Sequence, residues 1–314
     1  MRSYLAGETV QNTRLRSGGR WLMAMMIAVA AWSGGALGEG RLRVVCTTTM
    51  ITDLARQIAG DDADIFGIMR PGEDPHVYEV RPRDVQMIAG ADLLLTNGLH
   101  LESTLGHVIE NNTEGAMVVR LAETPRIVPL ESEQFRGAPD PHCWFNVTYF
   151  QIFAERTRDA LVKADPAHAE AYRRRATSYI AELEELHEWV RQEIGRVPRK
   201  QRVMVTSHDA FQYFGKAYDI DVFAVIGIST EEQPKPRDIT RLESIVRERN
   251  VKALFIETSV SQTLNRIVEK IAKSTGARIG GVLYSDSLGP PDTPAGTYIG
   301  MVRENVTTVV RALQ

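Results

Sequence analysis

"DPAHAEAYRRRATSYIAELEELHEWVRQEIGRVP", residues 165–198, is the longest helical stretch of the chain. Asp165 is a good N-cap residue with Pro166 at the first helical position, while Gly195 and Pro198 supply the stop. Between these signals, apolar residues recur at steps of three and four, which predicts one amphipathic helix. They are Ala171, Ala176, Ile180, Leu183, Leu186, Trp189 and Val190. About thirty residues at 1.5 Å each make a rod of roughly 45 Å, which is about the length of a domain.

The chain on either side of this helix shows one repeating pattern. Short apolar runs alternate with amphipathic segments over residues 43–121, and the pattern restarts after residue 200 and continues to about Leu313. Strands of about four to six residues that alternate with helices of about ten or more predict β-α units and largely parallel sheets. We therefore predict an α/β fold of two pseudo-symmetric lobes with mostly parallel sheets, joined by one long rigid helix.

The domain limits follow from the same pattern. We place the N-terminal lobe at residues 39–164, the linker helix at 165–197 and the C-terminal lobe at 198–314. A single helix between two lobes is stiffer than a hinge made of several strands. We therefore expect limited motion of one lobe against the other.

The first 38 residues differ from the rest of the chain. Arg14, Arg16 and Arg20 precede the unbroken apolar run of residues 21–32, and small residues then follow as far as Gly38. This order is typical of a secretory signal peptide at residues 1–38, and the run is shorter than the roughly 20 residues that span a bilayer. An uncleaved N-terminal anchor is the alternative. The first cysteine, Cys46, follows two valines and not a small residue after the apolar run, so we expect a periplasmic protein without a lipobox.

Composition limits the choice of partners and of covalent links. The formal net charge of −3 gives no sign of nucleic-acid binding. Two cysteines, Cys46 and Cys143, could form one disulfide in an oxidising compartment, or remain as two buried free thiols.

The phrase Asp-Pro-His occurs twice, at residues 74–76 and 140–142, and both copies follow predicted strands. His208 comes at the end of the strand "VMVTS", and Asp286 follows the strand "RIGGVL". In open α/β sheets, ligands bind outside the carboxyl ends of the strands, so two candidates from each lobe could face one site. Three imidazoles and one carboxylate suit Zn²⁺, Mn²⁺ and Fe²⁺. Because His76, His142, His208 and Asp286 would fill the shell, this set favours metal binding over hydrolysis.

Each of these positions also has a structural alternative. The two triplets could be turns that cap helices, His208 could bond locally near a helix start, and Asp286 could be an N-cap. Glu257, at the end of a predicted strand, could accept a hydrogen bond from a ligating imidazole. Trp144 and Phe145 are predicted to pack in the core beside the site. The remaining histidines lie on helical stretches or their edges and are predicted to be surface or structural residues: His100, His107, His168 and His187.

From about Arg43 onward the chain resembles the metal-specific solute-binding proteins of bacterial ABC importers, the TroA-like family that takes up zinc, manganese or iron(II). The stretches that carry the resemblance are "TTTMITDLARQIAGD", "GEDPHVYEVRPRD", "ADLLLTNGLHLE", "DPHCWFN", "TSHDAFQYFGKAY", "GISTEEQPKPRDI" and "LYSDSLG". The resemblance implies two α/β lobes joined by one long helix, with metal ligands at His76, His142, His208 and Asp286. It also implies delivery of the metal to a membrane permease, and we expect the protein to be a monomer and not an enzyme.

The third ligand position bears on the choice of metal. The resemblance implies zinc, or zinc and manganese, where histidine occupies the position of His208, and a nitrogen-rich set favours Zn²⁺. The missing histidine-rich loop between Leu121 and Asp140 and the sequence "LYSDSLG" favour manganese or iron instead. We therefore expect Zn²⁺ first, then Mn²⁺, then Fe²⁺. A secreted metal-dependent hydrolase is the alternative, although the chain lacks the HExxH and GxSxG motifs; an adhesin on the same fold is a third reading.

Overall fold

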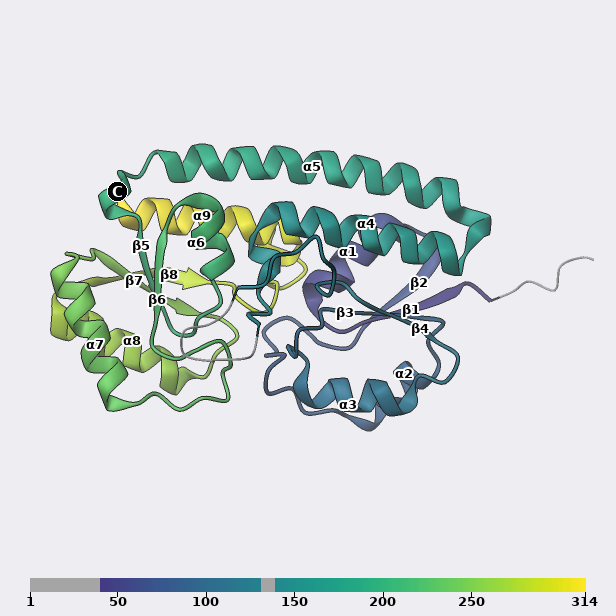
Figure 1. Cartoon of the computed structure of the whole chain (residues 1–314), viewed down its shortest axis with the longest axis horizontal. Coiled ribbons are helices and arrows are strands. Elements are labelled where there is room, and N and C mark those ends of the chain that lie inside the picture. Colours follow the sequence, from purple (N-terminus) through teal and green to yellow (C-terminus); the bar gives the residue numbers. More distant parts are fainter. Residues whose placement is uncertain (1–39, 131–138) are drawn as a thin grey trace, which may run out of the picture. The chain divides into compact units, whose positions relative to one another are not determined.

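The structure is a computed structural model that describes residues 40–130 and 139–314. Within this part, the N-terminal lobe has a four-stranded parallel sheet in the order β2-β1-β3-β4 (Figure 1). The strand order reverses beside β1, and such a point is where open α/β sheets bind ligands. The elements are β1 (Leu42–Cys46), α1 (Thr49–Ala59), β2 (Ala63–Gly67), α2 (Pro82–Ala89), β3 (Leu93–Thr96), α3 (Ser103–Asn112) and β4 (Met117–Arg120).

The C-terminal lobe repeats this plan with one difference. Strands β5 and β6 pair in parallel, β7 and β8 pair in parallel, and β5 lies next to β7. The order β6-β5-β7-β8 thus matches that of the first lobe, but the described residues form two ladders instead of one sheet. The elements are β5 (Val203–Thr206), α6 (Gln212–Tyr218), β6 (Asp221–Ala224), α7 (Pro236–Glu248), β7 (Ala253–Glu257), α8 (Gln262–Thr275), β8 (Arg278–Leu283) and α9 (Tyr298–Leu313).

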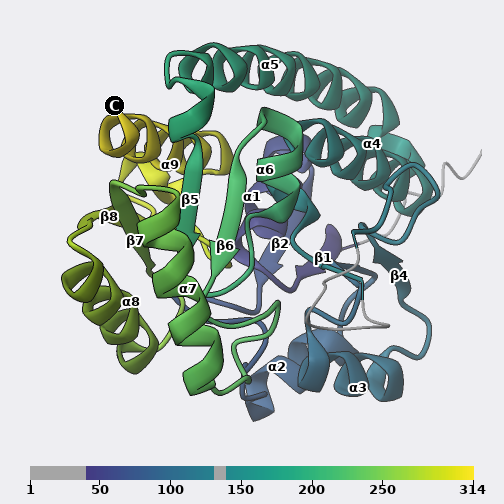
Figure 2. The ribbon, with the colours of Figure 1, turned by 60° about the vertical axis from the view of Figure 1, so that its left-hand side comes forward.

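The predicted connecting helix is α5 (Ala169–Gly195), which runs along both lobes (Figures 1 and 2). It contacts α1 and α4 of the first lobe and α6 and α9 of the second. Its end at Gly195 is as predicted, but Asp165 is not its N-cap. A 3-10 turn over Pro166–His168 precedes the helix, and the Asp165 carboxylate accepts a hydrogen bond from the Tyr172 hydroxyl at 2.6 Å. The carboxylate that we expected to cap backbone amides is therefore hydrogen-bonded to the tyrosine side chain instead.

One long helix, α4 (Val147–Ala164), was not predicted, and it packs along α5. A local signal for it exists, because the Asn146 side chain accepts a hydrogen bond from the Thr148 backbone N–H at 3.0 Å. Phe150, Phe153 and other buried residues then follow at helical spacing. The limits of 39–164, 165–197 and 198–314 for the lobes and the linker stay predictions.

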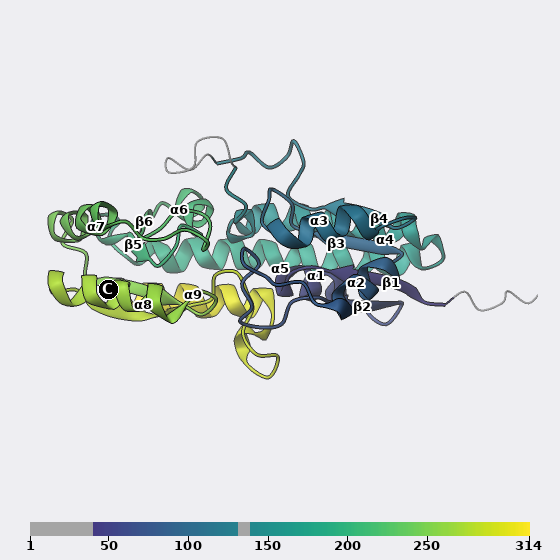
Figure 3. The ribbon, with the colours of Figure 1, turned by 90° about the horizontal axis from the view of Figure 1, so that it is seen from below.

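One apolar core extends through both lobes, and two smaller cores lie further from α5. The large core includes Trp144 and Phe150 from the first lobe and Phe211 and Tyr298 from the second. The rings of Phe150 and Tyr298 stack with centroids 3.5 Å apart. The second core lies beneath α7 and α8 and the third beneath α2 and α3, and Figure 3 shows these two helix pairs on opposite sides of the loops between the lobes. Apolar packing therefore joins the lobes on the α5 side.

The structure describes both cysteines but not the predicted signal peptide. Cys46 and Cys143 are both buried free thiols, so the second of the two alternatives for this pair holds. In the described ranges, no helix is long and apolar enough to cross a membrane. The predicted signal peptide, residues 1–38, lies outside the described residues.

Candidate metal centre

The four side chains predicted as metal ligands lie together between the lobes. One donor atom each of His76, His142, His208 and Asp286 lies within 4.8 Å of the other three, and all four residues are buried. His76 follows β2 and His142 follows β4, while His208 follows β5 and Asp286 follows β8. Because all these strands are parallel within their lobes, their carboxyl ends point the side chains toward one place.

Three distances between donor atoms are close to those around a tetrahedral ion. Nε2 of His142 lies 3.2 Å from Nε2 of His76 and 3.4 Å from Oδ1 of Asp286, and Nε2 of His208 lies 3.2 Å from Oδ2 of Asp286. Ligand atoms at about 2.0–2.1 Å from a zinc ion at the centre of a tetrahedron are about 3.3–3.4 Å apart. Nε2 of His208 and Oδ1 of Asp286 are also buried and form no hydrogen bond with the described residues. These donors could therefore bind an ion without breaking existing hydrogen bonds.

Asp140, the first residue of the second triplet, orients His142. Its Oδ1 accepts the backbone N–H of His142 at 2.9 Å and lies 2.7 Å from the ring Nδ1. A proton held on Nδ1 by this carboxylate leaves Nε2 free as a metal donor. From the sequence, Asp140 was expected only as part of a turn, and its contact with the His142 ring was not predicted. The available signal was a carboxylate two positions before a candidate ligand.

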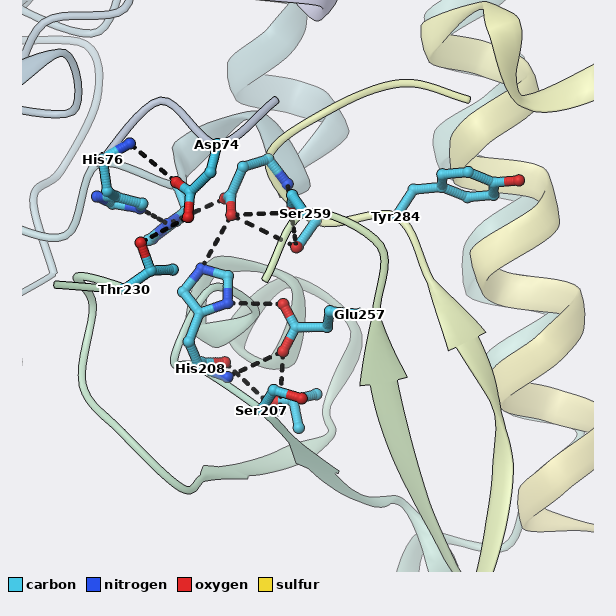
Figure 4. Close-up of polar contacts among 12 residues, drawn as sticks. Asp74, His76, Ser207, His208, Thr230, Glu257, Ser259 and Tyr284 are labelled. Atoms are coloured by element: carbon cyan, nitrogen blue, oxygen red, sulfur yellow. Dashed lines mark hydrogen bonds and ion pairs between the residues drawn. The ribbon is translucent and has the colours of Figure 1, made fainter. Parts of the chain in front are cut away.

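Asp74, the first residue of the other triplet, makes a different set of contacts. Its Oδ1 accepts the backbone N–H of His76 at 2.9 Å, as in the second triplet. Its Oδ2 accepts a hydrogen bond of 2.6 Å from the hydroxyl of Thr230, a residue of the C-terminal lobe, instead of contacting the His76 ring (Figure 4). The repeated phrase therefore forms the same backbone turn twice, with different side-chain contacts.

Glu257, at the end of β7, lies against His208 as the sequence suggested (Figure 4). Its Oε2 lies 2.6 Å from Nδ1 of His208, and its Oε1 accepts the backbone N–H groups of Ser207 at 2.8 Å and His208 at 2.9 Å. Both side chains are fully buried. Glu257 thus holds both the ring and the backbone of one candidate ligand.

Asp286 has its own support. Its backbone N–H donates to the Ser259 hydroxyl at 3.2 Å, and the same hydroxyl lies 3.2 Å from Oδ2 of Asp286. Asp286 is therefore anchored by a serine that follows β7, and both of its oxygens face imidazoles. A carboxylate placed in this way can offer one or two oxygens to an ion.

The three imidazoles of the centre differ in pKa. Burial lowers the pKa of His76 to about 3, so its ring is neutral at pH 7. Burial also lowers the pKa of His142, but Asp140 and Asp286 outweigh it and raise that pKa to about 9. For His208, Glu257 and Asp286 outweigh burial and raise the pKa well above its ordinary value. Burial raises the pKa of Asp286, but the His208 and His142 imidazolium groups lower it well below its ordinary value.

The other predicted features of the site lie where the sequence suggested. Trp144 and Phe145 are buried in the large core, and the Trp144 ring centroid is 5.1 Å from that of His142. The remaining histidines do not belong to the cluster, since three are exposed and one is half-buried on α5: His100, His107, His168 and His187.

The chain is similar over most of its length to known metal-binding proteins. The chain is 37% identical to the manganese-binding lipoprotein MntA of Bacillus subtilis over 90% of this chain and 93% of the relative. It is 36% identical to the zinc-binding protein TroA of Treponema pallidum over 90% of this chain and 92% of that protein. It is 35% identical to the iron-binding protein YfeA of Yersinia pestis over 86% of both chains.

Solved structures of metal-binding proteins also match this chain. The periplasmic zinc-binding protein TroA from Treponema pallidum superposes with a TM-score of 0.83 at 36% identity, over 87% of this chain and 99% of the other. A manganese-bound periplasmic metal-binding protein from Candidatus Liberibacter asiaticus has a TM-score of 0.78 at 29% identity, over 87% and 100%. Residues 44–312 match the family described as ZnuA, zinc-uptake complex component A, periplasmic. The chain therefore belongs to this family of metal-binding solute-binding proteins.

Proposed function

We propose that this protein captures one divalent transition metal outside the cytoplasm and delivers it to the permease of an ABC importer. The observation that carries the proposal is the buried cluster of His76, His142, His208 and Asp286, whose donor atoms lie within 4.8 Å of one another. Two ligands come from each lobe, so the ion would be enclosed between them. Relatives named for binding manganese, zinc and iron support a metal cargo.

The donor set supports transport and not catalysis. A catalytic zinc usually keeps one position open for water, whereas four protein donors complete a tetrahedral shell. The carboxylates nearest the imidazoles, Asp140 and Glu257, are already engaged with Nδ1 atoms and backbone amides. Neither is placed as a free general base. We therefore propose that the protein is not an enzyme, and we set aside the hydrolase and adhesin alternatives.

Zinc is the proposed first choice of ion, followed by manganese and iron(II). Three nitrogen donors and one carboxylate are softer than the oxygen-rich sets that Mn²⁺ prefers, and three of the donor distances, at 3.2–3.4 Å, are close to those in a tetrahedral zinc site. Affinity in vitro follows the Irving–Williams order, in which Zn²⁺ binds more tightly than Mn²⁺ and Fe²⁺. The ion that binds most tightly and the ion that is imported in the cell must therefore be determined by separate measurements.

The proposed location is the periplasm, with export directed by residues 1–38. In the sequence, the apolar run is followed by small residues, and the first cysteine is Cys46 within β1. Some relatives are named as lipoproteins. For this chain we propose export without a lipid anchor, and a monomer as the form that meets the permease.

The direct test is metal content and affinity. We expect about one metal ion per chain by elemental analysis, and competition with a chromophoric chelator should rank Zn²⁺ above Mn²⁺. His208→Ala should abolish high-affinity binding while circular dichroism stays unchanged. His107→Ala is the matched control, since this histidine is exposed on α3. Wild-type affinity in His208→Ala would sink the assignment, and metal-dependent ester or peptide hydrolysis lost in the same variant would favour the hydrolase.

A further inference from the structure

Two loops at equivalent positions of the two lobes meet beside the metal centre. The loop after β2, the second strand of the first lobe, carries Asp74 and His76. The loop after β6, the second strand of the other lobe, carries Thr230. The Thr230 hydroxyl donates to Oδ2 of Asp74 at 2.6 Å, a length typical of a hydroxyl bound to a carboxylate. Oδ1 of the same carboxylate accepts the backbone N–H of His76 at 2.9 Å.

A second hydroxyl of the C-terminal lobe reaches the other triplet. Tyr213 lies on α6 and is buried. Its hydroxyl donates to the backbone carbonyl of Asp140 at 3.2 Å and accepts the backbone N–H of Leu130 at 3.0 Å. Leu130 in turn accepts the backbone N–H of Asp140 at 2.8 Å through its carbonyl. Asp140, whose carboxylate holds the His142 ring, is therefore itself held by the opposite lobe.

We propose that Thr230 and Tyr213 are positioning residues that make the geometry of His76 and His142 depend on the C-terminal lobe. Each acts through the aspartate of one Asp-Pro-His turn, and neither belongs to the ligand set. The inference rests on the proposed function and adds to it. The C-terminal lobe supplies two ligands directly and also holds in place the two ligands of its neighbour.

The packing explains why the Thr230 hydroxyl can have this role. The large apolar core joins the lobes on the α5 side, whereas the cores beneath α2 and α3 and beneath α7 and α8 are separate. On that outer side, the lobes meet through polar contacts such as Thr230 with Asp74, and the Gly72 N–H with the Ser287 hydroxyl at 2.8 Å. A polar contact can break and re-form in water at small net cost, whereas separating packed apolar surface is costly. Such contacts can therefore report that the lobes are together without locking them.

The test uses the full chain and removes one hydroxyl at a time. Thr230→Val keeps the shape of the side chain and Tyr213→Phe keeps the ring. Changes in residues that hold metal-ligating groups typically weaken metal binding by about 10–100-fold, so we expect at least about tenfold faster Zn²⁺ dissociation into excess chelator for each variant. Thr230→Ser keeps the hydroxyl and should restore the wild-type rate. The double variant should lose Zn²⁺ faster than either single variant, since the hydroxyls hold different turns.

A visible absorption spectrum separates positioning from general stability. Co²⁺ bound at saturation reports ligand geometry through its d–d bands, and these bands should shift in Thr230→Val and Tyr213→Phe. Matched controls remove hydroxyls elsewhere: Thr240→Val loses a bond to Pro236 within α7, and Tyr172→Phe loses the bond to Asp165 near the start of α5. Both controls should keep the wild-type spectrum and dissociation rate, whatever they do to the melting temperature.

The outcomes separate the two claims. A wild-type chain that binds metal, together with hydroxyl-free variants that show the same dissociation rate and spectrum, would overturn this inference alone. The same holds if Thr230→Val and Tyr213→Phe lower only the melting temperature of the metal-free protein. A wild-type chain that binds neither Zn²⁺ nor Mn²⁺ would overturn the proposed function and the inference with it. If Tyr213→Phe fails to fold, the comparison of Thr230→Val with Thr230→Ser decides.

Discussion

The turns Asp74–His76 and Asp140–His142 have the same sequence and the same backbone hydrogen bond, yet they treat their histidines differently. In both, the aspartate accepts the N–H of the histidine two positions later, at 2.9 Å. Asp140 also holds the ring of His142, whereas Asp74 turns its second oxygen to Thr230 of the other lobe. His142 is fully buried, and His76 is the most exposed of the four candidate ligands at 6%.

The difference shows that one motif can supply a fixed ligand and an adjustable one. The His142 ring is oriented by a carboxylate of its own turn before any ion arrives. The other lobe binds the backbone of that turn through Tyr213, whereas in the first turn it binds the Asp74 carboxylate itself, so the position of His76 should respond more strongly to the separation of the lobes. We expect His142 to define the centre of the site, and His76 to complete it.

Loss of either ligand should have the largest effect. We expect His142→Ala and His76→Ala each to weaken Zn²⁺ binding by more than the roughly 10–100-fold that follows from changes behind the ligands. The loss should be greater for His142, because it removes the imidazole that Asp140 has already oriented. Competition with a chromophoric chelator measures both affinities, and His107→Ala serves again as the exposed control. Equal losses would mean that the two turns contribute alike.

The two turns should also differ in their dependence on pH. The pKa of His142 is raised to about 9 and that of His76 is lowered to about 3, so of these two rings only that of His142 is an imidazolium in the metal-free protein at pH 7. An ion must displace that proton, and each displaced proton makes the affinity rise about tenfold per pH unit. The pKa of His208 is raised as well, so two protons should be released per ion near neutral pH. Affinity should therefore rise with pH, and the part of this rise that comes from His142 should end above about pH 9.

Calorimetry in two buffers of different ionisation enthalpy counts these protons, and NMR of the imidazole protons assigns them. The sign for stability is opposite to that for binding. The pKa of His142 is higher in the folded chain than in the unfolded chain. Its contribution to the stability of the metal-free protein is therefore complete at a pH below the ordinary pKa of histidine, and it is lost as the pH rises through about 9. A His76 resonance that titrates near its ordinary pKa, or a binding heat independent of buffer, would contradict this account.

Exchanging each aspartate for asparagine isolates the ring contact. Asp140→Asn keeps the size of the side chain but weakens its hold on Nδ1 of His142, so Zn²⁺ affinity should fall by about 10–100-fold. Asp74→Asn should cost less, since that carboxylate contacts only the backbone N–H of His76 and a hydroxyl. Glu257→Gln is the third member of the series and should resemble Asp140→Asn, because Glu257 lies against Nδ1 of His208. Asp74→Asn with the larger loss would reverse the comparison.

Much of this arrangement follows from the sequence, because strand ends can be read locally. The strands before His76, His142, His208 and Asp286 are short apolar runs with clear limits, and parallel strands send their carboxyl ends to one edge. The long helix was also predictable from its apolar spacing and from Gly195. Both predictions depend only on residues that are neighbours in the chain.

The contacts that distinguish the two turns could not be predicted in this way. Thr230 lies 156 positions after Asp74, and no local pattern indicates that it meets that carboxylate. The Asp140 contact with the His142 ring is local but depends on a rotamer, since the same sequence at Asp74 makes no such contact. The N-cap role of Asp165 was predicted wrongly for a similar reason, because Tyr172 competes for the carboxylate.

The prolines of the two turns should give the smallest effects and the sharpest comparison. A proline that fits its native backbone contributes about 0.4–1 kcal/mol by limiting other conformations, which corresponds to about two- to fivefold in an equilibrium constant. Pro75→Ala should therefore weaken Zn²⁺ binding by about two- to fivefold, because the Asp74 carboxylate and the Ser103 hydroxyl, which donates to the His76 carbonyl at 3.1 Å, hold the backbone of this turn but not the His76 ring.

Pro141→Ala should leave Zn²⁺ affinity within about twofold of the wild-type value, since the remaining ties of its turn still limit the backbone. The Asn97 side chain would still donate to the carbonyl of residue 141, a bond of 3.1 Å in the wild type, and Asp140 would still hold the His142 ring. The Pro141→Ala substitution should instead lower the free energy of unfolding, measured with urea on the metal-free protein. If Pro141→Ala weakens metal binding more than Pro75→Ala does, the second turn is the adjustable one and the roles assigned to the two histidines must be exchanged.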